Sequence, residues 1–134
     1  MPYEVIEHTA DLKIRVWGSS LENLFREAVL AMMKLIKDAA VGSPTEEQKI
    51  NIEAPDATAL LIDFLSEILA LSQTNKEIYT KVNLIRFSQN SLEAVLEGVK
   101  VDDFDEDIKA VTYHEANVRQ NEKGKWETLL VFDI

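Results

Sequence analysis

The last apolar stretch of the chain, "WETLLVFDI" at residues 126–134, places the strongest constraint on its fold. Leu129 to Phe132 is a continuous apolar run, which is typical of a strand that is buried on both faces. Such a strand lies inside a sheet and has neighbours on both sides. We therefore expect a central strand that brings the side chain of Asp133 and the α-carboxylate of Ile134 to one edge of the sheet.

Residue periodicity predicts two helices and several strands. Helical spacing covers about Ser20–Lys37, where Ser19 and Glu22 form a capping-box pattern, and a second helix runs from Pro55-Asp56 to about Gln73. Alternation predicts strands at Tyr3–Glu7, Leu12–Trp17, Lys49–Ala54, Tyr79–Ser88, Leu92–Val101, Ile108–Tyr113, Ala116–Gln120 and Trp126–Asp133. We predict one α+β domain over residues 1–134, with two helices packed on one face of a mixed, mostly antiparallel sheet.

The composition excludes several classes of site. The 134 residues include no cysteine, which rules out zinc–thiolate sites, iron–sulfur clusters and thiol catalysis, and a cytoplasmic location is expected. The net charge of -10 opposes strong direct binding to nucleic acids, since that affinity comes largely from basic side chains. A signal-peptide pattern is absent, and we see no apolar run near the roughly 18 residues that span a bilayer, so no membrane association is expected.

The stretch "IEHTADLKI", residues 6–14, interrupts the strand pattern with polar residues. If Asp11 lies at the same sheet edge as Asp133 and Ile134, three carboxyl groups converge there. Carboxylates placed so closely repel each other unless they hold a cation, and an all-oxygen ligand set favours Ca²⁺, Mg²⁺ or Mn²⁺. The alternative is that Asp11 caps a turn and that the chain end is solvated.

Other chemical groups give weaker patterns. "VDDFDED", residues 101–107, begins with the spacing of a calcium-binding EF-hand loop, but Ile108 replaces the required glycine, which favours a solvated acidic loop. His8 and His114 have no nucleophile motif beside them. Lys109 follows the acidic run and could neutralise its neighbours, or meet a phosphate or a partner's carboxylate.

Four stretches together resemble the archease family over nearly the whole chain. They are "EHTADLKIRVWGSSLENLF", "DATALLIDFLSEILAL", "IKAVTYHEANV" and the final "VFDI". The resemblance implies a two-layer α/β fold. It also implies an activator of the RNA-splicing ligase RtcB, which promotes guanylylation of the ligase by GTP, supports multiple turnover in tRNA splicing and broadens nucleotide use.

In this family a divalent metal, for which we favour Ca²⁺, is bound by residues that correspond to Asp11, Asp133 and Ile134. The family's functional lysine corresponds to Lys109, and His8 and His114 lie in its motifs. This chain has Leu12-Lys13 after "HTAD", where the family usually has an apolar residue and glycine. A free-standing metal-dependent phosphohydrolase that uses Asp11 and Asp133 is the alternative, and a metal-stabilised binding module for another partner is a third possibility.

Overall fold

The computed structural model describes residues 2–8, 11–40 and 42–134, with the side chains of residues 7 and 8 outside the description. Its elements in chain order are β1 (Tyr3–His8), β2 (Asp11–Gly18), α1 (Leu21–Ile36), β3 (Glu46–Glu53), α2 (Ala57–Asn75), β4 (Glu77–Phe87), β5 (Ser91–Lys100), β6 (Ala110–Thr112), β7 (Arg119–Gln120) and β8 (Trp126–Asp133).

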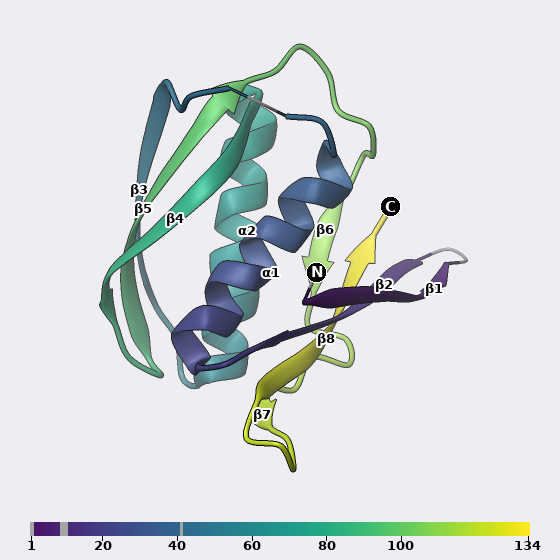
Figure 1. The fold of residues 1–134 in the computed structure, drawn as a ribbon, viewed down its shortest axis with the longest axis vertical. Helices are drawn as coiled ribbons and strands as arrows, with labels where there is room; N and C mark the ends of the chain where they lie inside the picture. Colours follow the sequence, from purple (N-terminus) through teal and green to yellow (C-terminus); the bar gives the residue numbers. More distant parts are fainter. Residues whose placement is uncertain (1, 9–10, 41) are drawn as a thin grey trace.

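The strands form two antiparallel sheets, and the two helices lie between them (Figure 1). One sheet has the order β1–β2–β8–β6, with β7 also paired to β8, and the other has the order β3–β5–β4. The α+β class is confirmed. The arrangement differs from the predicted single mixed sheet, because alternation shows which side chains face a core but does not show which strands pair.

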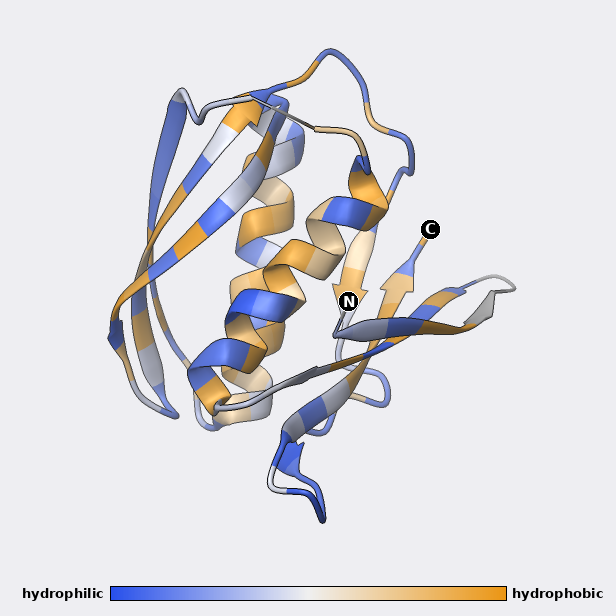
Figure 2. Cartoon of the chain, in the orientation of Figure 1, coloured by the Kyte–Doolittle hydropathy of each residue, from blue (hydrophilic) through white to orange (hydrophobic). Residues whose placement is uncertain are grey.

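The core fills the space on both sides of the helix layer. Figure 2 shows apolar residues, in orange, along both helices and interspersed with hydrophilic ones along the strands. The centre of the Phe25 ring in α1 lies 6.2 Å from the ring centre of Phe64 in α2 and 5.0 Å from that of Phe87 in β4. One aromatic cluster therefore joins three elements. The predicted central strand is confirmed, because β8 pairs with β2 on one side and with β6 and β7 on the other.

Helix α2 is a core helix with an unusually apolar composition. Its 19 residues and mean hydropathy of 1.3 would fit a membrane span by length and composition alone. From the sequence we did not identify this stretch as one of that length and hydropathy. Here the helix packs against both sheets and buries residues such as Leu61, Phe64 and Ile68. Burial inside a folded domain explains the same composition.

The start of α1 departs from the predicted capping box. Ser20, and not Ser19, is the N-cap, and its Oγ accepts a hydrogen bond from the Asn23 main-chain N–H at 3.0 Å. The Asn23 Oδ1 in turn accepts from the Ser19 N–H at 3.0 Å. Asn23 therefore performs the reciprocal role that the sequence pattern assigned to Glu22.

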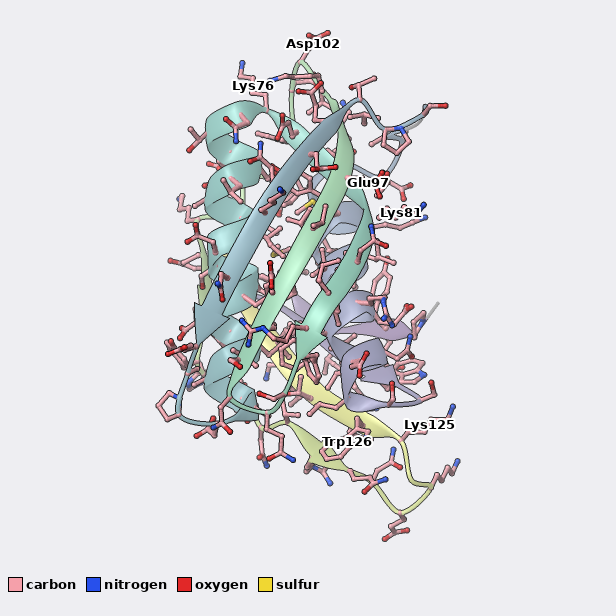
Figure 3. The ribbon with its side chains drawn as sticks, turned by 90° about the vertical axis from the view of Figure 1, so that its left-hand side faces the viewer. Lys76, Lys81, Glu97, Asp102, Lys125 and Trp126 are labelled. Carbon is pink, nitrogen blue, oxygen red and sulfur yellow. The ribbon has the colours of Figure 1, made fainter. Side chains whose placement is uncertain are left out.

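The outer strands carry irregularities that interrupt their edges. β1 has a register shift between Val5 and Glu7, and β4 has one between Tyr79 and Lys81 and another between Leu84 and Arg86. Figure 3 shows the outer face of the β3–β5–β4 sheet, from which Lys81 and Glu97 stand out among many charged side chains. Bulges and exposed charges on edge strands oppose pairing with another chain.

The aspartates of the acidic segment at residues 101–107 are exposed, as predicted, but the segment is also tied to the end of α1. The N–H groups of Asp105 and Glu106 donate to the Ile36 carbonyl at 2.7 and 3.3 Å. The Lys37 ammonium donates to Asp103 at 2.6 Å, and this hydrogen bond holds the pKa of Asp103 below its usual value. The segment thus satisfies a carbonyl that the helix end leaves without an intrahelical partner.

Candidate metal site at the end of the central strand

Asp11 and Asp133 face each other on neighbouring strands. Asp11 is the first residue of β2 and pairs directly with Asp133, the last residue of β8. Strand alternation places both carboxylates on the face of the sheet that points away from the helices, because Leu12, Ile14, Leu130 and Phe132 fill the opposite face. Both aspartates are exposed, so the pair is open to solutes.

Lys109 approaches the same place through its main chain. Its N–H donates to the Asp133 carbonyl at 2.7 Å, and Ala110 then pairs with Asp133 as β6 begins. The Lys109 side chain is exposed. Three segments that are far apart in the sequence therefore meet at Asp133, which lies between β2 and β6.

The structure gives the other predicted site residues weaker links to the Asp11–Asp133 pair. Ile134 is half-buried and packs against the core. His8 pairs with Leu12 in the β1–β2 ladder, and its side chain is outside the described part of the structure, as are residues 9 and 10. His114 is exposed, and its Nε2 lies 4.0 Å from a carboxylate oxygen of Glu115.

The donor set suits a hard cation. Two opposed carboxylates supply anionic oxygen atoms of the kind that Ca²⁺, Mg²⁺ and Mn²⁺ prefer. Across residues 2–8, 11–40 and 42–134, no group of three or more His, Cys, Asp or Glu side chains is arranged to hold a metal ion. A cation at Asp11 and Asp133 would therefore need main-chain oxygen, the Ile134 carboxylate or water to complete its shell.

One contact beside the pair was not foreseen from the sequence. Residues 113–118, which we call the crossing segment, link β6 to β7 without pairing as a strand. Strands were predicted at Ile108–Tyr113 and Ala116–Gln120, and both are shorter in the structure. Within it, Glu115 has a φ of 61° and meets the Lys13 ammonium at 2.6 Å. Alternation in β2 would have put Lys13 on the face of Asp11, but no sequence pattern indicated Glu115 as its partner.

Three hollows open on the described surface away from the acidic pair. They have volumes of about 340, 250 and 200 Å³. The smallest includes Lys109 and lies between α2 and β6. Within the described part of the chain, Asp11 and Asp133 are exposed and line none of these three hollows.

Comparison with known proteins matches the sequence of this chain to one family. A family model described as the Archease protein family (MTH1598/TM1083) matches residues 3–134. The chain belongs to the archease family. Among curated relatives, the archease of Methanosarcina mazei is 35% identical, with 98% of this chain and 95% of the relative aligned. The archease of Methanopyrus kandleri is 34% identical over the full length of both chains.

Solved archease structures share the fold. The solution structure of protein 1598 from Methanobacterium thermoautotrophicum has a TM-score of 0.81 and 26% identity, and covers 99% of both chains. A crystal structure from Thermotoga maritima, described as an archease and possible chaperone, has a TM-score of 0.69 and 23% identity, and covers 98% of this chain and 96% of that one. The two-sheet arrangement with central helices is therefore the archease fold.

Proposed function

We propose that this protein activates the RNA-splicing ligase RtcB by promoting guanylylation of the ligase and its multiple turnover in tRNA splicing, and by broadening its nucleotide use. The observation that carries the proposal is the direct pairing of Asp11 with Asp133, both exposed, where β2 begins and β8 ends. Membership of the archease family supports it. The protein acts on the ligase and is not itself an enzyme in this proposal, and it works in the cytoplasm.

The proposed cofactor is a divalent cation, Ca²⁺ in the first place and Mg²⁺ or Mn²⁺ as alternatives. Asp11 and Asp133 hold it through their carboxylates, and the α-carboxylate of Ile134 adds a third oxygen ligand. The cation neutralises the acidic pair, so that this end of the sheet can approach the phosphates of a nucleotide bound to the ligase. RNA is held by the ligase, which fits a chain with a net charge of -10.

Lys109 is the proposed contact for the partner or its nucleotide. Its main chain is fixed beside Asp133 by a 2.7 Å hydrogen bond, whereas its ammonium is exposed. A compact positive charge next to a cation site suits a phosphate or a carboxylate. His8 and His114 belong to the same motifs and are proposed as supporting contacts.

A multiple-turnover ligation assay with the cognate ligase tests the proposal. We expect the wild-type protein to raise both ligase guanylylation and the number of turnovers. Asp11→Ala and Asp133→Ala should reduce both toward the level without added protein. Asp102→Ala is the matched control, since Asp102 is an exposed acid in the 101–107 segment. Circular dichroism should show that all variants retain the fold.

A short C-terminal tag tests the role assigned to Ile134. The tag converts the α-carboxylate into an amide, so stimulation should fall, whereas the same tag at the N terminus should leave it unchanged. Full stimulation by both aspartate variants and by the C-terminally tagged protein would contradict the proposed site. Hydrolysis of nucleotide or RNA by the protein alone would favour the phosphohydrolase alternative.

A further inference from the structure

A small hollow of about 200 Å³ lies between helix α2 and strand β6, which forms one edge of its sheet beside β8 (Figure 1). The two most buried residues that line it, Leu69 and Val111, are apolar and are 4% and 8% exposed. Ser66 and Ala70 line it from α2, and Lys109 lines it from the position just before β6. The hollow therefore combines an apolar interior with a lysine at its rim.

Two hydrogen bonds tie α2 to the chain at the two ends of β6. The Gln73 side-chain amide donates to the Ile108 carbonyl at 2.6 Å, just before the strand. The Tyr113 hydroxyl donates to a carboxylate oxygen of Asp63, just after the strand. Asp63 and Gln73 flank the α2 residues of the hollow in the sequence, so the helix and the strand are held together on both sides of it. A preformed hollow of this kind needs little ordering when a partner binds.

The volume of the hollow indicates the size of its occupant. Pockets that bind small-molecule ligands usually have volumes of about 300–1,000 Å³. A hollow of about 200 Å³ is small for such a ligand and suits a single apolar side chain of a partner protein.

The charge at the rim indicates what should lie next to that side chain. Among the described residues that line the hollow, Lys109 is the one charged residue, and its side chain is exposed. The ion pairs found among the described residues do not include Lys109. Its ammonium complements a carboxylate of a partner. Phosphates are more often held by clusters of basic side chains or by several N–H groups together.

We propose that this hollow docks a short segment of the partner ligase, with one apolar side chain inserted between α2 and β6 and a neighbouring carboxylate of that segment paired with Lys109. The identity of the partner rests on the proposed function. The inserted side chain supplies affinity by excluding water, and the ion pair at the rim fixes the orientation of the segment. Because the Lys109 N–H donates to the Asp133 carbonyl at 2.7 Å, the docked segment lies beside the acidic pair.

Calorimetric titration of the cognate ligase in the presence of Ca²⁺ tests the docking. Ala70→Phe fills the hollow and should weaken ligase binding by about tenfold or more. Ser66→Phe fills it from a second position and should act in the same direction. Ala39→Phe is the matched control, because Ala39 is an exposed alanine in the turn after α1, and it should change the affinity by less than about twofold. Melting temperatures near that of the wild type should show that these variants are folded.

Lys109→Met tests the carboxylate contact, because it keeps an apolar side chain and removes the charge. The variant should weaken ligase binding by about three- to tenfold at low salt, and its affinity should depend less on salt than that of the wild type. The loss should be the same for nucleotide-free ligase and for ligase bound to GTP. A loss that appears only with GTP would overturn the carboxylate contact and assign the ammonium to a phosphate.

Calcium titrations of the variants alone separate this proposal from the cation site. Ala70→Phe should bind Ca²⁺ as the wild type does, whereas Asp11→Ala should not. If both hollow-filling variants bind the ligase with wild-type affinity while Asp11→Ala abolishes stimulation, the docking proposal is wrong and the proposed function stands. If they bind the ligase weakly while Asp11→Ala stimulates fully, the docking stands and the cation site is wrong. A wild-type protein that does not bind the ligase would reject both.

Discussion

Asp11 and Asp133 lie directly opposite each other on β2 and β8, so two like charges occupy one cross-strand pair. Such a pair destabilises an antiparallel sheet by about 0.2–1 kcal/mol. We therefore expect Asp11→Asn to raise the free energy of unfolding of the metal-free protein by about that amount in urea titrations at low salt. The gain should fade at about 1 M salt, where exposed charges are screened.

The same variant should lose the response to calcium. A ligand that binds the folded state stabilises it by mass action, so Ca²⁺ should raise the melting temperature of the wild-type protein. Asp11→Asn should show little or no such rise, whereas Asp102→Asn should behave like the wild type. Equal responses in all three proteins would argue against a cation at this pair.

The N-cap of α1 gives a prediction that separates two adjacent serines. Ser20 accepts a hydrogen bond from Asn23 at 3.0 Å through its side chain, whereas Ser19 contributes its main-chain N–H to the Asn23 side chain. Ser20→Ala should therefore cost about 1 kcal/mol of unfolding free energy. Ser19→Ala should cost less than about 0.5 kcal/mol, since its main-chain contact remains. Chemical denaturation of the two variants checks the order.

Glu77 is a buried carboxylate that should make the free energy of unfolding depend on pH. It is 2% exposed and accepts hydrogen bonds from Gln48 at 3.0 Å and from the Tyr79 hydroxyl at 2.8 Å, with the Lys100 ammonium at 3.5 Å. Burial by itself raises the pKa of Glu77, but the hydrogen bonds and the ammonium outweigh burial and hold the pKa below its ordinary value.

Because the pKa of Glu77 is lower in the folded state, its contribution to stability is present above the unfolded pKa of about 4.5. That contribution is lost as the pH falls below this value and through the lower folded pKa. Urea titrations from pH 7 to pH 3 should show that Glu77→Gln is less stable than wild type at pH 7. The difference should narrow below pH 4.5. A constant difference across this range would contradict the assignment.

Gly98 is required by the close approach of β4 to β5. A Cβ at this position would lie 2.2 Å from the Ile78 carbonyl oxygen, which belongs to the main chain and cannot move aside without disturbing β4. We expect Gly98→Ala to cost about 3 kcal/mol or more. Gly124→Ala should cost about 1–2 kcal/mol, because its φ of 79° is strained but a Cβ there would have space. A reversed order in thermal denaturation would contradict this reading.

The sequence was sufficient to predict the environment of the candidate site. The apolar run from Leu129 to Phe132 correctly indicated a central strand, and the alternation of Leu12, Ile14 and Val16 correctly indicated the buried face of β2. Together these patterns placed Asp11 and Asp133 at compatible positions. Their role as metal ligands remains a prediction from the family resemblance.

The sequence did not show which strands far apart along the chain would pair, nor the details of the turns. Nothing in the alternation of β3, β4 and β5 shows that they form a sheet of their own, because partner choice depends on long-range packing. The contact of Lys13 with Glu115 depends on a left-handed residue in the crossing segment, and a glutamate gives no local signal for that conformation. The N-cap role of Ser20 was not predicted, because its partner is an asparagine rather than the expected glutamate.

The position of β8 between β2 and β6 sets an order for assembly during synthesis. β4 and β5 are joined by a short turn and can pair as soon as both have left the ribosome. β2 can likewise pair early with β1, but its second neighbour, β8, lies near the far end of the sequence. Until β8 emerges, the helix surfaces that will face the β1–β2–β8–β6 sheet have no permanent cover. A stalled or truncated chain would therefore expose apolar helix surface and recruit chaperones, even with the β3–β5–β4 sheet already formed.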